Sequence, residues 1–269
     1  MRRVERQGRT RASEASWDDG ARSRGAIDLT NRVVLVTGAA RRVGRAIARS
    51  LAKDGARIAV HYHASAEEAA EAVGDIAAGD PGRAQAFAAD LRDATAAQDL
   101  PQRVAERMGR LDVLVNSAAI MLRQPFGEVS PQGWHEVLDL NLRAAFFTSQ
   151  GAATALKAAR GKIVNISDVA AFEAWPAYLP HSISKAGVGM LTRGLARVLA
   201  PEVTVNAVAP GPVLLPEGWS PEAVDQTIRT TPLGRLGTPD DVAAAVRFLL
   251  DADYMTGTTL VVDGGRLIR

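Results

Sequence analysis

Three ionisable side chains in the second half of the chain are spaced so that together they could move a proton. Asp168 follows the apolar segment 161–166, and His181 and Lys185 come shortly after it. Because His181 and Lys185 are four residues apart, they share one face of a helix. A carboxylate at the end of a strand can meet that face. A carboxylate, an imidazole and an ammonium group that converge in this way beside a cofactor form a site for proton transfer.

Asn141 is a polar residue within the apolar helical segment 137–142. An amide among buried helix positions must find hydrogen-bond partners or cost roughly 1–3 kcal/mol. A local bend of the helix would satisfy it, or it could line a site. Both interpretations remain open at this stage.

Two glycines near the start of the folded region, Gly38 and Gly44, separate an apolar run at 33–37 from a helical segment. A strand, a tight glycine turn and a helix start form the geometry that binds dinucleotide phosphates. Arg42 stands where a third glycine is expected. Such turns are often purely structural, so two glycines alone do not decide between the two interpretations.

The residues that follow the second strand bear on the choice of cofactor. No acid lies between Ala56 and Ala66, where an NAD-binding fold often places one to hold the ribose 2′-hydroxyl. Arg41 and Arg42 can instead offer charge to a 2′-phosphate, with Ser65 as a hydrogen-bond donor. Both arginines could simply be solvated, but cations at a helix N-terminus are disfavoured by its dipole. We therefore expect NADPH (NADP) as the cofactor.

These residues must be positioned by alternating strands and helices. Apolar runs predict strands at 33–37, 56–61, 84–88, 111–116, 161–166, 203–208 and 258–262, and helical spacing predicts helices near 43–54, 65–78, 94–108, 131–159, 182–200 and 239–250. The alternation predicts an α/β fold, a single-domain doubly wound parallel sheet (Rossmann-like) with helices on both faces. Ligands bind such sheets at the carboxyl ends of the strands. Asp90 and Asn116 lie at such ends. Asp90 could hydrogen-bond the adenine amino group and Asn116 could hold the turn beneath the cofactor, or each could simply cap the end of its strand.

Length, composition and charge limit the number of domains, the partners and the compartment that we expect. The chain has 269 residues, 32 basic and 30 acidic, and no cysteine. Its net charge of +2 lies in residues 1–28, which we expect to be a disordered N-terminal arm preceding a single domain at 29–269. A neutral folded part argues against nucleic acid, and no apolar run reaches the ~20 residues of a membrane span. We expect a cytoplasmic protein with a small-molecule substrate and no metal site.

Several of these motifs occur in one order and spacing: Thr37-Gly38 with Gly44, Asn116-Ser117-Ala118, Asn141, the helix that carries Lys185, Pro210-Gly211, and the segment 254–265. This pattern resembles the short-chain dehydrogenase/reductase superfamily over about residues 31–266. Within it, Asp168, the Thr-Gly-Ala-Ala-Arg-Arg run and the His-Tyr-His segment resemble the pteridine reductase branch, which implies NADPH and often a tetramer. The resemblance implies cofactor contacts at Gly38, Arg41, Arg42, Val43, Gly44, His63, Ser65, Asp90, Leu91, Asn116, Ala118, Lys185, Pro210 and Gly211.

The resemblance also implies a catalytic set of Asn141, Asp168, His181 and Lys185, with two departures from the family. Asp168 occupies the position of the catalytic serine, and His181 that of the catalytic tyrosine. Histidine can transfer protons, with an ordinary pKa near 6.5. We expect His181 to be the proton donor and Asp168 to support it. The branch stacks pterin on an aromatic residue where this chain has Met121, so the substrate side is assigned to Met121, Asp168 and Tyr178.

Two function classes follow. The first is an NADPH-dependent oxidoreductase that acts on a small carbonyl or imine, such as a ketone, quinone or pterin-like compound. The alternative is a catalytically weak or inactive dinucleotide-binding protein of the same fold, with a regulatory or assembly role. Small and apolar residues on several faces of 131–159 and 182–200 favour a homo-oligomer, and the resemblance implies a dimer or tetramer.

Overall fold

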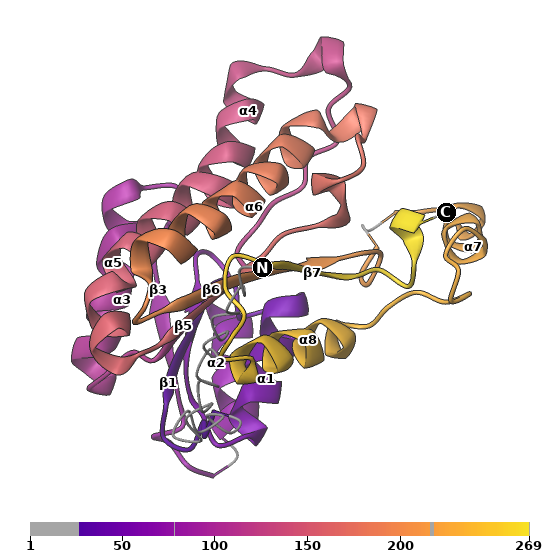
Figure 1. Ribbon diagram of the computed structural model, residues 1–269. Helices are drawn as coiled ribbons and strands as arrows, with labels where there is room; N and C mark the ends of the chain where they lie inside the picture. The colour runs from indigo at the N-terminus through magenta and orange to yellow at the C-terminus, as the bar shows by residue number, and fades with distance from the viewer. Residues whose placement is uncertain (1–26, 78, 216–217, 269) are drawn as a thin grey trace, which may run out of the picture.

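In the computed structural model, which describes residues 27–77, 79–215 and 218–268, seven strands form one sheet. The strand order is β3-β2-β1-β4-β5-β6-β7, and every neighbouring pair is parallel (Figure 1). The strands are β1 (Val33–Val36), β2 (Arg57–Tyr62), β3 (Ala84–Ala88), β4 (Val113–Asn116), β5 (Lys162–Ile166), β6 (Thr204–Pro210) and β7 (Thr259–Val262). The predicted doubly wound parallel sheet is thereby confirmed.

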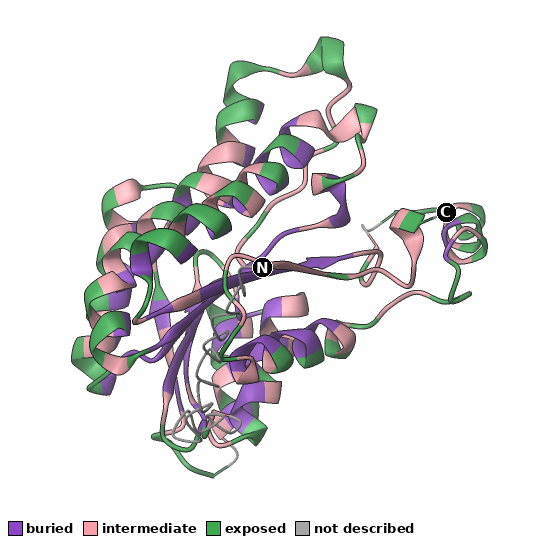
Figure 2. Cartoon of the chain, in the orientation of Figure 1, coloured by how far each residue is buried: buried purple, intermediate pink, exposed green. Residues whose placement is uncertain are grey.

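Helices cover both faces of this sheet, which is why its central strands β1, β4 and β5 are buried along their whole length. On one face lie α1 (Arg42–Lys53), α2 (Ala66–Ala77) and α8 (Pro239–Asp251). On the other lie α3 (Ala94–Met108), α5 (Ala144–Ala159) and α6 (Leu179–Leu199). Figure 2 shows the resulting pattern, with buried residues along the strands and on the inward sides of the helices. No helix among the described residues is long and apolar enough to span a membrane.

The strand order reverses at β1, because β2 and β3 lie on one side of it and β4 to β7 on the other. In open parallel sheets, such a reversal leaves a crevice at the carboxyl ends of the two strands that flank it. The loop after β1 and the loop after β4 therefore face each other. Thr37 ties them together, because its Oγ1 accepts hydrogen bonds from the amides of Ser117 and Ala118 at 2.9 and 3.0 Å.

The predicted helix 131–159 is not one helix. It consists of α4 (Pro131–Leu138), a π-helical turn η2 (Asp139–Arg143) and α5. Asn141 lies in the π turn, where its side chain leaves the regular helix pattern to reach other partners. The helix predicted at 182–200 begins earlier, at Leu179, because Pro180 is tolerated in a first helical turn.

Other elements were not predicted from the sequence. A short helix, α7 (Pro221–Arg229), follows β6 and buries only Thr227, so its sequence carries little apolar signal. Short 3₁₀ turns are η1 (Phe126–Glu128), η3 (Val169–Ala171), η4 (Pro176–Tyr178) and η5 (Arg266–Ile268). Most of the expected N-terminal arm, residues 1–26, lies outside the described residues. Ile27, at its end, donates its backbone N–H to Asp251 at 2.9 Å and so contacts α8.

Candidate active site

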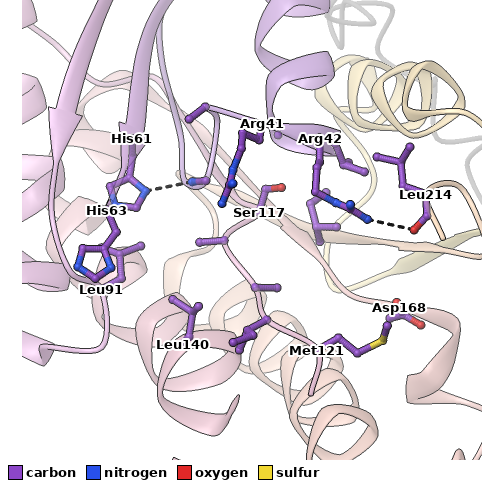
Figure 3. Close-up of a pocket in the computed structure, with 18 of the residues that line it drawn as sticks. Arg41, Arg42, His61, His63, Leu91, Ser117, Met121, Leu140, Asp168 and Leu214 are labelled. Carbon is purple, nitrogen blue, oxygen red and sulfur yellow. Dashed lines mark hydrogen bonds between the residues drawn. The ribbon is translucent and has the colours of Figure 1, made fainter. Parts of the chain in front are cut away.

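A cavity of about 750 Å³ opens at the carboxyl ends of the strands, in the crevice beside β1 (Figure 3). Its volume is in the range that holds a small-molecule ligand. Nearly all the cofactor residues expected from the sequence line it: Gly38, Arg41, Arg42, Val43, Gly44, His63, Ser65, Asp90, Leu91, Ala118, Lys185, Pro210 and Gly211. Asn116 is the exception. It lies beneath the cavity, where its amide nitrogen donates to Ser149 and Asn165.

The backbone geometry of the glycine loop, which follows β1, requires glycine at both Gly38 and Gly44. Gly38 adopts a φ of +67°, in the left-handed region that favours glycine. A Cβ on Gly44 would overlap the carbonyl oxygen of Gly38, so the start of α1 packs directly against the loop. Arg42 also has a positive φ, +54°, although it carries a side chain. Its position is therefore one that suits a glycine, as the spacing of the motif indicated.

His61, which the sequence analysis did not assign, holds this loop in place. Its Nδ1 accepts a hydrogen bond from the Gly38 amide at 3.0 Å, and its Nε2 lies 3.1 Å from the Ala89 carbonyl oxygen, to which it donates (Figure 3). This pattern requires the neutral ring. Burial lowers the pKa of His61 from 6.5 to about 4, which keeps the ring neutral. The position of His61 on β2 was evident from the sequence, but its partner was not.

Charged side chains gather at the end of the cavity beside α1 and α2. Arg41 lies 3.6 Å from Glu68, and Arg42 donates to the carbonyl oxygen of Leu214 at 3.1 Å. His63 lies 3.8 Å from Asp90. Arg92 donates to both carboxylate oxygens of Asp90 and, chiefly through these bonds, lowers the Asp90 pKa to about 2. Asp90 also accepts from the Arg92 backbone, so it caps the turn after β3 while lining the cavity.

The proton-transfer candidates meet at the other end of the cavity. Asp168 caps η3 and accepts a hydrogen bond from the Ala170 amide through Oδ1 at 2.8 Å. Its Oδ2 lies 3.6 Å from Nε2 of His181. The His181 side chain is only 4% exposed, whereas that of Asp168 is 26% exposed. Nε2 is itself buried and has no hydrogen-bond partner among the described residues. The carboxyl group is thus the more accessible member of the pair.

Lys185 completes this group from the next turn of α6. It is fully buried, and its Nζ donates to the carbonyl oxygen of Ile166 at 2.9 Å. Burial lowers the pKa of Lys185 from 10.5 to about 8, an effect that the nearby Asp168 carboxylate partly opposes. Ser167 donates its hydroxyl to the Lys185 carbonyl at 3.0 Å, so β5 and α6 are held together at this point.

Asn141 is satisfied by a local distortion of the helix, because the π turn directs its amide at the loop after β4. Its Oδ1 accepts from the Ile120 amide at 2.8 Å, and its Nδ2 donates to the Ile120 carbonyl at 2.9 Å and to Ser184 at 3.0 Å. It also lies 3.4 Å from Nδ1 of His181. Asn141 does not itself line the cavity, but it fixes Ile120, which does.

Of the residues expected to contact the substrate, one lines the cavity and another does not. Met121 lines the cavity near Asp168 (Figure 3). Tyr178 does not line it, and its ring packs edge-on against Trp175 with centroids 6.1 Å apart. Trp175 in turn stacks on His181, a contact that the sequence analysis missed. No cluster of three or more His, Asp or Glu side chains in the described part of the chain could hold a metal ion.

With this geometry in place, comparison with known proteins identifies the family. A family model described as enoyl-(acyl carrier protein) reductase matches residues 38–266, from the glycine loop to the last turn. The chain belongs to the short-chain dehydrogenase/reductase superfamily. Named relatives in this family are oxidoreductases, and the cavity at the carboxyl ends of the strands is the candidate active site.

Relatives in this superfamily act on quite different molecules. The chain is 36% identical over 247 residues to 3beta-hydroxysteroid dehydrogenase 1 of Eggerthella lenta, covering 88% of this chain and 94% of the relative. It is 38% identical over 247 residues to a 3-oxoacyl-[acyl-carrier-protein] reductase of a Synechocystis species, covering 89% and 98%. A crystal structure of a dehydrogenase/reductase from Sinorhizobium meliloti shares 36% identity, with a TM-score of 0.83 over 90% of this chain and 97% of that chain.

Proposed function

We propose that this short-chain dehydrogenase/reductase transfers hydride between NADPH and a small carbonyl or imine, and that Asp168 and His181 move the accompanying proton as a pair. The observation that carries this proposal is the pair itself, with 3.6 Å between Oδ2 and Nε2, beside a cavity that also contains Lys185. When bound, NADPH supplies the hydride. The protein must then bind the cofactor, orient the substrate and deliver one proton to its oxygen or nitrogen.

The hydrogen positions on His181 follow from its neighbours. The Asp168 oxygen opposite Nε2 is an acceptor, so it favours a proton on Nε2. The substrate cannot reach Nε2 directly, because that atom is buried, whereas the Asp168 carboxyl group faces the cavity. Asp168 therefore makes the substrate contact, and His181 supplies the proton through it. This arrangement assigns to the pair the task that a tyrosine performs in the family pattern.

The proposed cofactor contacts use the two arginines beside the glycine loop. A 2′-phosphate at this end of the cavity would meet the guanidinium groups of Arg41 and Arg42, with Ser65 and His63 nearby on its other side. The bonds these arginines now make are exposed, to Glu68 and to the Leu214 carbonyl, and such contacts are readily exchanged for a phosphate. Lys185, by its position, is assigned to the nicotinamide ribose.

The cofactor assignment is tested by titrating NADPH and NADH against protein fluorescence. Arg41→Ala should weaken NADPH binding by roughly 1.5–3 kcal/mol, the value of a charge-assisted hydrogen bond, and change NADH binding little. Arg49→Ala, on the same helix but outside the cavity lining, is the matched control. Equal or tighter binding of NADH by the unmodified protein would refute the NADPH assignment.

The activity is tested by following NADPH oxidation with ketones, quinones, cyclic imines and pterins. On an accepted substrate, His181→Phe should lose about 10²–10⁴-fold in turnover, the usual contribution of proton transfer, while it still binds cofactor. Tyr178→Phe is the control, and it should keep its rate. If Tyr178→Phe loses activity and His181→Phe does not, the proton donor is the tyrosine, and our assignment is wrong.

One observation favours the second candidate, a dinucleotide-binding protein with little catalysis. His181 Nε2 is buried, and its 3.6 Å separation from Asp168 exceeds a good hydrogen bond. Micromolar NADPH affinity together with no turnover across the whole panel would support this candidate over the reductase.

We also propose that the chain forms a homodimer or homotetramer. Several of the small residues thought to face outward are buried within this chain, including Ala144, Ala145 and Ala152, where α5 packs on α3. Large apolar residues on α5 and α6 nevertheless remain exposed, among them Phe146, Met190 and Val198. Covering them is the expected role of a second copy. A monomer at micromolar concentration in sedimentation velocity would refute the proposal.

A further inference from the structure

The aromatic ring of Trp175 lies against the imidazole of His181. The two ring centroids are 6.4 Å apart, and the ring planes differ by 17°, so the rings are stacked. Trp175 belongs to the loop between β5 and α6, which follows Asp168 and leads into the helix that carries His181. The neighbouring Tyr178 contacts the indole edge-on, at 75°. Trp175 is thus held from one side and packs against the proton-transfer pair on the other.

A carboxylate fixes the opposite edge of the indole. Trp175 Nε1 donates a hydrogen bond to Oε2 of Glu173 at 3.1 Å. Nε of Arg266 lies 3.6 Å from the same oxygen. Both charged side chains are mostly buried, with 25% of Glu173 and 18% of Arg266 exposed. Because a partly buried ion pair is screened less than an exposed one, Arg266 restricts where this carboxylate lies.

The C-terminal turn that carries Arg266 is itself well fixed. Asp263 follows β7 and accepts hydrogen bonds from the amides of Gly265 and Leu267, both at 2.8 Å. Its backbone packs so closely on Gly211 that a Cβ there would overlap it. Figure 1 shows this turn at the end of the chain, beyond β7 and close to α7. Through Arg266 and Glu173, the turn therefore reaches the loop between β5 and α6 from a distant part of the sequence.

We propose that Trp175 is a positioning residue for His181, and that Arg266 and Glu173 hold Trp175 in place from the C-terminal turn. The inference rests on the proposed function of the Asp168–His181 pair. Rotation of an imidazole about its last torsion has only broad minima, so the ring needs packing to keep Nε2 directed at Asp168. The stacked indole supplies that restraint on one face. Glu173, Trp175 and His181 lie close together in the sequence, whereas Arg266 reaches them from the C-terminal turn through its ion pair with Glu173.

A spectroscopic experiment tests the positioning without requiring a substrate. The chain contains four histidines, so the ring resonances of His181 can be assigned by comparison with His181→Phe. The indole shifts these resonances through its ring current, and we expect Trp175→Leu to remove that shift. Arg266→Ala should move the His181 resonances in the same direction, and Arg266→Lys should restore them in part. Trp134→Leu, which removes a tryptophan on another element, α4, should leave them unchanged.

Kinetics then test the consequence. On an accepted substrate, Trp175→Leu should lower kcat about tenfold and Arg266→Ala about threefold, each with a larger solvent deuterium isotope effect and unchanged NADPH affinity. His181 resonances that do not move in Arg266→Ala would overturn the inference, as would unchanged kcat and isotope effect in both variants. If instead His181→Phe keeps its turnover, the proposed function fails, and the NMR result still decides the positioning. If Trp175→Leu does not fold, Arg266→Ala and Arg266→Lys carry the test.

Discussion

His61 accepts a hydrogen bond from the Gly38 amide, with 3.0 Å between Nδ1 and the amide nitrogen. This bond joins the end of β2 to the glycine loop, and the Nε2 contact with Ala89 joins the same ring to the end of β3. One neutral imidazole thus spans three neighbouring connections of the sheet. The loop that is to hold the cofactor phosphates depends on it.

The first prediction concerns acid stability. The pKa of His61 falls from 6.5 to about 4 in the folded protein, so between these values the unfolded chain binds a proton that the folded one does not. The contribution of His61 to the free energy of unfolding is therefore largest above pH 6.5. It declines by up to about 3 kcal/mol as the pH falls towards 4. Urea unfolding between pH 4 and 7 measures it. His61→Asn keeps an acceptor without the titration, so its stability should fall less. Parallel pH profiles of the two proteins would contradict the prediction.

The second prediction concerns the strained residue in the loop. A positive φ costs a residue with a side chain about 1–2 kcal/mol, and glycine avoids this cost but loses some 0.5–1 kcal/mol in chain entropy. Arg42→Gly should therefore be as stable as the original or up to about 1 kcal/mol more stable. Its NADPH affinity should fall, because a guanidinium at the phosphate end of the cavity is lost.

Arg42→Ala separates these two effects. It loses the guanidinium but keeps the φ of +54°, so it should bind NADPH as weakly as Arg42→Gly and be less stable than that variant. Thermal unfolding and fluorescence titration of the three proteins provide the measurements. Equal stability of the alanine and glycine variants would show that the backbone at this position relaxes.

The layout of the fold could be read from the sequence because its signals are local. The strand β1 is a run of four buried apolar residues, and α1 repeats its apolar residues at helical spacing. Some of the cavity residues were proposed from the rule that ligands bind at the carboxyl ends of parallel strands, and the others from the resemblance to the superfamily. Asp168 and Lys185 both line that cavity; Asp168 was proposed from its place after a strand, and Lys185 from its spacing to His181.

The features of the site that the sequence did not predict depend on contacts that only the folded structure shows. In the π turn the amide of Asn141 pairs with Ile120, and neither residue indicates the other in the sequence. His61 was assigned no role because its partner is a backbone amide. Trp175 was assigned no role, since its stacking on His181 requires the three-dimensional structure.

The third prediction concerns Asn141. Removing its amide in Asn141→Ala takes away two hydrogen bonds from the part-buried N–H and C=O of Ile120, which should cost about 1–3 kcal/mol of stability. Ser184→Ala removes one of the same hydrogen bonds and should cost about 1 kcal/mol. Urea unfolding measures both costs. Similar losses in the two variants would mean that the Ile120 contacts contribute little.

The last prediction concerns the buried ammonium of Lys185. Its pKa is lowered from 10.5 to about 8, chiefly by burial, so between these values the unfolded chain holds more protons than the folded protein. Stability from this group therefore rises with pH from about 8 to 10.5, by up to about 3 kcal/mol. Lys185→Met lacks this titration. At pH 7 we expect it to be more stable than the original protein, although the lost hydrogen bond to Ile166 offsets about 1 kcal/mol of the gain. Asp168→Asn removes the charge that raises the Lys185 pKa, so the rise should begin below pH 8. The measurement is the difference in unfolding free energy between each protein and Lys185→Met, from pH 7 to 10. If this difference stays constant for the unmodified protein, the buried lysine stays protonated over the whole range and the prediction is wrong.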